Sequence, residues 1–107
     1  MAYVNLKDAR ECVQNREIFN GNNCYAVLQS DDMENYRYVV YSYGSHWPLF
    51  IHESGVWYEN VSKYSRTTSK HRSMLHPLCD TTPMEFNQMQ VLAESGIVGL
   101  SLNSPRD

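Results

Sequence analysis

The chain has 107 residues, of which 42% are hydrophobic and 20% are charged, and its formal net charge is −3 at pH 7. These values are typical of a folded globular protein and argue against global disorder, and the length predicts a single domain over residues 1–107. The acidic balance also argues against a protein that coats nucleic acid without specificity.

Residues 5–17 have the periodicity of a short amphipathic helix, with Asn5 able to cap its first turn. Residues 20–23 predict a turn, and residues 24–29 predict a first strand. Residues 36–43, YRYVVYSY, form the clearest strand pattern. Because large side chains alternate onto both of its faces, we expect this strand to lie in the centre of a sheet.

Residues 47–52 and 56–61 predict a hairpin around Gly55, and Tyr64 and Ser65 predict a last short strand. A short helix is expected to start near Thr67 and to stop before Pro77. A second helix is expected to start with Thr82 as cap and to run to Gly96, followed by an apolar closing segment over residues 97–102.

Together these elements predict an α+β fold with a small antiparallel sheet of four to five strands. The N-terminal helix and two C-terminal helices are expected around the sheet, with the C-terminal pair packed on one face.

A basic, hydroxyl-rich segment lies between Asn60 and Cys79, where four Lys or Arg residues occur without any acid. Hydroxyls, amides and cations at a helix start suit a phosphate or carboxylate, because the helix dipole favours an anion there. The alternative is an ordinary helix cap followed by a solvated face. The candidate binding residues of this segment are Lys63, Tyr64, Arg66, Thr67, Thr68, Ser69, Lys70, His71 and Arg72.

A second candidate surface is aromatic, with Tyr36, Tyr38, Tyr41 and Tyr43 beside Arg37 on one strand and Trp47 and Trp57 nearby. The candidate binding residues of this surface are Tyr41, Tyr43, His46 and Trp47. Tyrosine and tryptophan rings can stack on bases or can anchor a protein partner. The alternative is that these rings pack in the core beneath helices.

Catalytic and metal-binding patterns are missing from the sequence. Neither Cys24 nor Cys79 stands in a nucleophile motif, and the histidines and cysteines lack metal-ligand spacing. We therefore expect no enzyme activity, no metal and no cofactor. Three widely spaced cysteines, without a signal peptide or a membrane-spanning run, predict a cytoplasmic protein that has free thiols and no membrane association.

Two motifs are distinctive, YSYG at residues 41–44 and YSRTTSKH at residues 64–71, and they are accompanied by short patterns in residues 16–22, 48–49 and 57–60. Together they resemble a group of small uncharacterised proteins of bacteriophages, plasmids and other mobile elements, with a weaker likeness in residues 92–99. The resemblance implies a mobile-element accessory protein in a bacterial cytoplasm, and it assigns no catalytic residue.

The expected function is therefore non-enzymatic binding of a macromolecule. The leading interpretation is a phage- or plasmid-type protein that binds a host or competing-element protein, including inhibition of a host defence complex. The alternative is a nucleic-acid or phosphate-binding module that uses the TTSKH segment and the aromatic strand. The sequence leaves the oligomeric state open.

Overall fold

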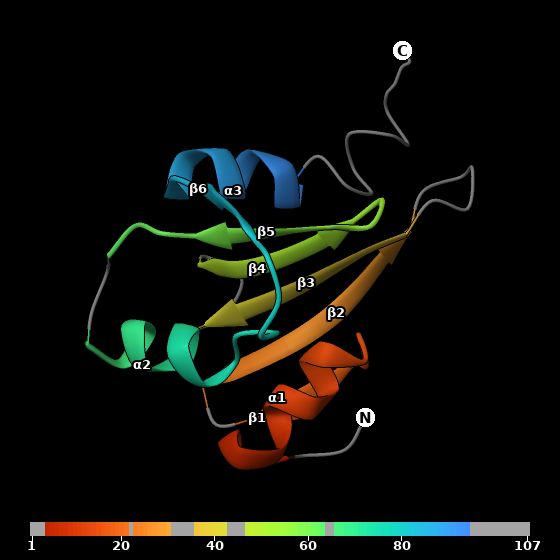
Figure 1. The fold of residues 1–107 in the computed structure, drawn as a ribbon, viewed down its shortest axis with the longest axis vertical. Helices are drawn as coiled ribbons and strands as arrows, with labels where there is room; N and C mark the ends of the chain where they lie inside the picture. The colour runs from red at the N-terminus through yellow and green to blue at the C-terminus, as the bar shows by residue number, and fades with distance from the viewer. Residues whose placement is uncertain (1–3, 22, 31–35, 43–46, 64–65, 95–107) are drawn as a thin grey trace.

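The computed structural model describes residues 4–21, 23–30, 36–42, 47–63 and 66–94. The predicted sites at Tyr43, His46 and Tyr64, the predicted strand at Tyr64 and Ser65, and the closing segment over residues 97–102 lie outside these residues. The described chain is an α+β structure in which a six-stranded sheet lies between helices (Figure 1).

The sheet follows the chain order without interruption, so each strand lies beside the next one. The first five strands form an antiparallel meander, and the last strand joins parallel to the fifth. The strands are β1 (Phe19–Gly21), β2 (Cys24–Ser30), β3 (Tyr36–Ser42), β4 (Pro48–Glu53), β5 (Val56–Asn60) and β6 (Thr82–Met84). The sheet is therefore larger than predicted, and its sixth strand makes it mixed.

The predicted central position of β3 is confirmed. This strand pairs with β2 on one side and with β4 on the other, and all its residues from Arg37 to Ser42 are buried. Its two faces contribute to separate hydrophobic clusters, because Tyr38 and Val40 join one cluster while Val39 and Tyr41 join the other.

The three helices are α1 (Leu6–Gln14), α2 (Arg66–Met74) and α3 (Phe86–Glu94). The larger cluster contains Ala9 and Val13 of α1 and Leu75, which directly follows α2. The smaller cluster contains Met89 and Ala93 of α3. The two later helices therefore cover opposite faces of the sheet, and the expectation that they share one face is wrong (Figure 1).

The start of α3 also differs from the prediction. Thr82 and Pro83 belong to β6, and the helix starts at Phe86. Pro83 fits an edge strand, because it cannot donate a ladder hydrogen bond. The Phe86 amide donates to Oγ of Ser62 at 2.8 Å, so the first turn is capped by a residue from the connector after β5.

None of the helices in the described part of the chain is long and apolar enough to span a membrane.

Candidate binding surfaces

Most of the described aromatic candidates lie in the core, and Tyr36 alone among them is exposed, at 61%. Tyr41 is 7% exposed and stacks on Tyr25, with 5.2 Å between ring centroids. Trp47 is 8% exposed and stacks on Phe86 at 4.5 Å. Their burial leaves little ring surface for a partner, as the core-packing alternative anticipates.

The basic segment divides into a buried and an exposed side. Thr68 and His71 face the core, and Nδ1 of His71 lies 2.8 Å from Oγ of Ser42. Burial lowers the pKa of His71, and the charge of Lys70 lowers it further. The candidates exposed to solvent are Lys63, Arg66, Thr67, Ser69 and Lys70.

A polar hollow of about 560 Å³ lies between α2 and the end of β5. It brings together three of the sequence candidates, Lys63, Ser69 and Arg72. Sequence reasoning offered no reason to separate these three from the other candidates of the basic segment. Its remaining lining residues are Glu59, Ser73, His76 and Leu78. We call this feature the polar hollow.

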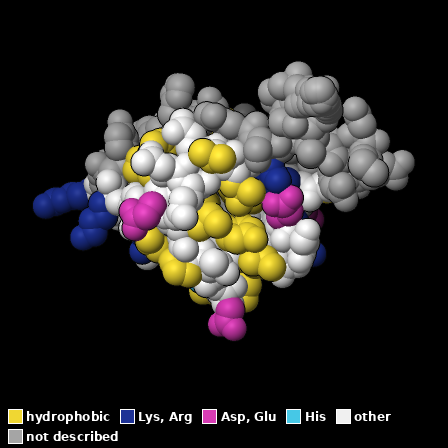
Figure 2. Space-filling model, turned by 90° about the horizontal axis from the view of Figure 1, so that it is seen from above, with side chains coloured by type: hydrophobic (Ala, Val, Ile, Leu, Met, Phe, Trp, Pro, Cys, Tyr) yellow, Lys and Arg dark blue, Asp and Glu magenta, His cyan; other side chains and the backbone are white. Residues whose placement is uncertain are grey.

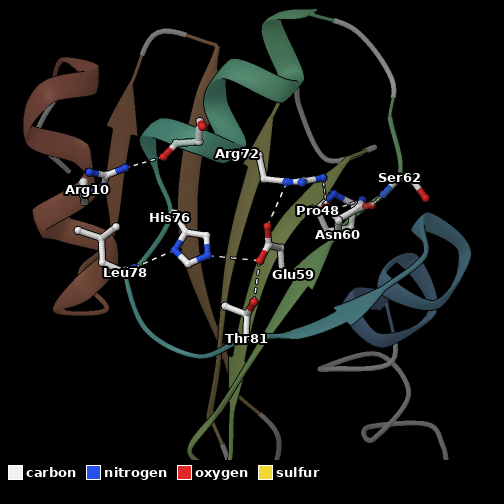
Figure 3. A network of polar contacts seen from close by, with 10 residues as sticks. Arg10, Pro48, Glu59, Asn60, Ser62, Arg72, His76, Leu78 and Thr81 are labelled. Atoms are coloured by element: carbon white, nitrogen blue, oxygen red, sulfur yellow. Dashed lines mark hydrogen bonds and ion pairs between the residues drawn. The ribbon is translucent and has the colours of Figure 1, made fainter.

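Glu59 organises the wall of the polar hollow (Figure 3). Its Oε2 lies 3.0 Å from Nε of Arg72, and its Oε1 lies 3.3 Å from Nε2 of His76. The Thr81 hydroxyl donates to the same Oε1 at 2.6 Å. With its side chain 13% exposed, Glu59 therefore joins β5 to α2 and to the segment before β6.

The ring of His76 is oriented by its second nitrogen. The Leu78 amide donates to Nδ1 of His76 at 2.9 Å, so in the neutral ring the proton is on Nε2 and points to Glu59. Both nitrogens are thus engaged, and His76 acts as a wall of the hollow and is not available as a base.

Hydrogen-bond donors remain available inside the polar hollow. Arg72 uses Nε toward Glu59 and Nη1 toward the Asn60 carbonyl at 3.2 Å, whereas its Nη2 makes no hydrogen bond to another described residue. Lys63, Ser69 and Ser73 are exposed, and their side chains likewise have no hydrogen bond within the described ranges.

A second hollow, of about 430 Å³, lies on the other side of the sheet along α3. It is lined by Met84, Asn87, Gln88, Val91 and Leu92, mostly through their apolar atoms. Val91 is 67% exposed. Figure 2 looks onto this side of the molecule, where hydrophobic side chains gather at the centre and Asp or Glu side chains stand around them. We call this feature the α3 hollow.

Cys24 and Cys79 differ in their exposure to solvent. Burial raises the pKa of the Cys24 thiol to about 11, so at neutral pH this sulfur is an unreactive thiol. Cys79 is exposed. No group of three or more His, Cys, Asp or Glu side chains with metal-ligand geometry occurs among the described residues.

Sequence reasoning missed most of both hollows. Glu59, Ser73 and His76 come together through folding and have no shared motif. The α3 hollow had no sequence signal of its own, because the apolar residues over 84–93 predict a helix without showing that Val91 faces solvent.

Comparisons of the chain with protein-family models, with curated proteins and with solved structures found no match.

Proposed function

We propose that this protein is a non-enzymatic binding protein that docks a partner protein on the α3 hollow. The observation that carries the proposal is an apolar hollow on the surface, next to a valine that is 67% exposed. Solvent-facing apolar hollows rimmed by polar groups are typical of protein interaction sites.

The energetics favour an apolar anchor from the partner. Burying an exposed valine side chain contributes about 1–2 kcal/mol, and an anchor that fills the hollow also covers Met84 and Leu92. A few such contacts at the centre of an interface supply most of its affinity.

The charge around the α3 hollow indicates the chemistry of the partner. Glu85 follows Met84 of the lining, and Figure 2 shows Asp or Glu side chains around the apolar centre. A partner segment with an apolar side chain flanked by basic residues would therefore be favoured over an acidic one. In the setting that the sequence motifs imply, the partner is a protein of a bacterial host or of a competing element, and docking inhibits it.

Nucleic-acid binding is the second candidate, and the exposed cations Lys63, Arg66 and Lys70 favour it. Sequence-tolerant binding of single strands also needs aromatic rings that can stack on bases. Tyr36 is the one aromatic candidate exposed among the described residues, because Tyr41 and Trp47 are buried, so the candidates supply charge with little stacking surface. We therefore rank protein docking first.

The proposal is tested by affinity capture from nuclease-treated bacterial lysate, quantified by mass spectrometry. The bait proteins are the wild type, Val91→Asp in the α3 hollow, and Ile18→Asp as a matched control at an exposed site away from it. Val91→Asp is expected to lower partner recovery about tenfold, the equivalent of about 1.4 kcal/mol. Both variants should keep the melting temperature of the wild type, because both side chains are exposed.

Equal recovery of the partner by Val91→Asp and by the wild type would contradict docking on α3. Loss of all captured protein on nuclease treatment would favour the nucleic-acid candidate instead.

A further inference from the structure

We propose that the polar hollow beside α2 is a binding site for a phosphomonoester group. The polar hollow and the α3 hollow lie on opposite faces of the sheet. Ligand binding at the polar hollow can therefore be tested independently of partner docking on α3.

The polar hollow contains several donors that make no hydrogen bond to another described residue. Four groups contribute donors, namely Nη2 of Arg72, the Lys63 ammonium and the hydroxyls of Ser69 and Ser73. Arg72 is already paired with Glu59, so Lys63 supplies the uncompensated positive charge of the lining, and Nη2 of Arg72 and the two hydroxyls add hydrogen bonds to the phosphoryl oxygens.

Helical spacing places these donors side by side. Ser69, Arg72 and Ser73 are three and four residues apart in α2, so they share one side of the helix. Lys63 lies in the connector after β5, in a segment separate from α2. A ligand in the hollow would thus be held from two separate segments.

The carboxylate of Glu59 orients this site, and its negative charge is offset by the guanidinium of Arg72. Both oxygens already accept from Arg72, His76 or Thr81 (Figure 3). Its contact with Nε fixes the guanidinium plane of Arg72, which leaves Nη2 to bind the ligand. A preorganised arginine loses less entropy on binding a phosphoryl group than a mobile one.

The size of the hollow favours a phosphate ester over a nucleic-acid backbone. A volume of about 560 Å³ accommodates a phosphoryl group with a small organic substituent. A phosphomonoester presents three terminal oxygens to the donors of the hollow, whereas a backbone phosphodiester presents two.

The test is an amide NMR titration of the ¹⁵N-labelled chain with inorganic phosphate and with O-phosphoserine, at constant ionic strength set by chloride. Saturable shifts are expected at the amides of Lys63, Ser69 and Ser73. Saturation with either probe supports the site, and the tighter of the two shows whether it prefers free phosphate or an organic ester.

Two lysine variants make the titration specific. Lys63→Ala removes a lining cation with no hydrogen bond to a described residue and should weaken binding at least tenfold. Lys70→Ala removes an exposed charge of α2 outside the lining and should change affinity less than twofold at 0.15 M salt.

Three outcomes would overturn the inference. Shifts that do not saturate would indicate diffuse attraction only. An equal loss of affinity in Lys63→Ala and Lys70→Ala would also indicate diffuse electrostatic attraction only. Tighter binding of a single-stranded DNA oligonucleotide than of phosphoserine, with shifts spread over Arg66 and Lys70, would identify a nucleic-acid surface.

Discussion

Among single residues, His71 is a buried side chain of the core and not part of a binding surface. It was a candidate ligand for anions, yet its side chain is 3% exposed and contacts Ser42 of the central strand. Because burial lowers its pKa below the ordinary value of 6.5, the folded protein holds a neutral ring.

This burial predicts that the protein loses stability in mild acid. The unfolded chain takes up a proton near pH 6.5 while the folded chain does not, so stability is full above that pH. Below it, the free energy of unfolding falls by up to about 1.4 kcal/mol per pH unit until the lower, folded-state pKa is reached. His52, whose pKa burial also lowers, adds to the effect.

Thermal unfolding between pH 7.5 and 5 measures this dependence. His71→Gln should flatten the fall in melting temperature, and His52→Gln should flatten it less, because His52 is less buried. A melting temperature that is constant over this range in the wild type would show that the folded state binds the proton as readily as the unfolded state.

At the scale of elements, Arg37 joins the central strand to its neighbours on the α3 side. Its Nη2 lies 2.7 Å from Oε2 of Glu53 in β4, and its Nη1 donates to the Leu92 carbonyl of α3 at 2.7 Å. The arginine therefore satisfies a carbonyl in the last turn of α3, where intrahelical partners run out.

We predict that Arg37→Lys weakens the docking of α3. A lysine ammonium cannot place two separate nitrogens as the guanidinium does, so one contact is lost, at about 1–2 kcal/mol. Denaturant unfolding measures the loss, and hydrogen exchange should rise in Phe86–Glu94. Arg66→Lys, at an exposed site in α2, is the matched control. Similar stability of the two variants would mean that the Leu92 contact contributes nothing.

Sequence patterns predicted the elements that are determined by residues within the element itself. Asn5 caps α1 as expected, with its Oδ1 accepting from the Asp8 amide, and the alternation in β3 predicted its central position. The start of α3 was predicted wrongly, because Thr82 and Pro83 suit an edge strand as well as a helix start. The cap that decides between them is Ser62, more than twenty residues away in the sequence.

The candidate sites were predicted only in part, because some of their residues come together through tertiary packing. The sequence indicated Lys63, Ser69 and Arg72, whose charge and hydroxyls are visible locally. It could not indicate Glu59, which meets Arg72 because α2 connects two parallel strands, β5 and β6. The exposure of Val91 depends on which side of α3 meets the sheet, and that choice is made by tertiary packing.

At the scale of the whole molecule, the sheet separates two surfaces of different chemistry. The α3 side presents an apolar hollow with Asp or Glu side chains around it (Figure 2). The α2 side presents a polar hollow with donors that make no hydrogen bond to another residue in the described part of the chain. A partner protein and a phosphorylated ligand could therefore bind at the same time without contact between them. We propose that the α3 side is the one that docks the protein partner.

The most direct measurement is amide hydrogen exchange on the captured complex, compared with the unbound protein. Docking on the α3 hollow predicts slower exchange in residues 84–92 and unchanged exchange in residues 66–74 of α2. Protection confined to residues 63–76, with α3 exchanging as in the unbound protein, would contradict the account and would transfer the protein-binding role to the basic side of the molecule.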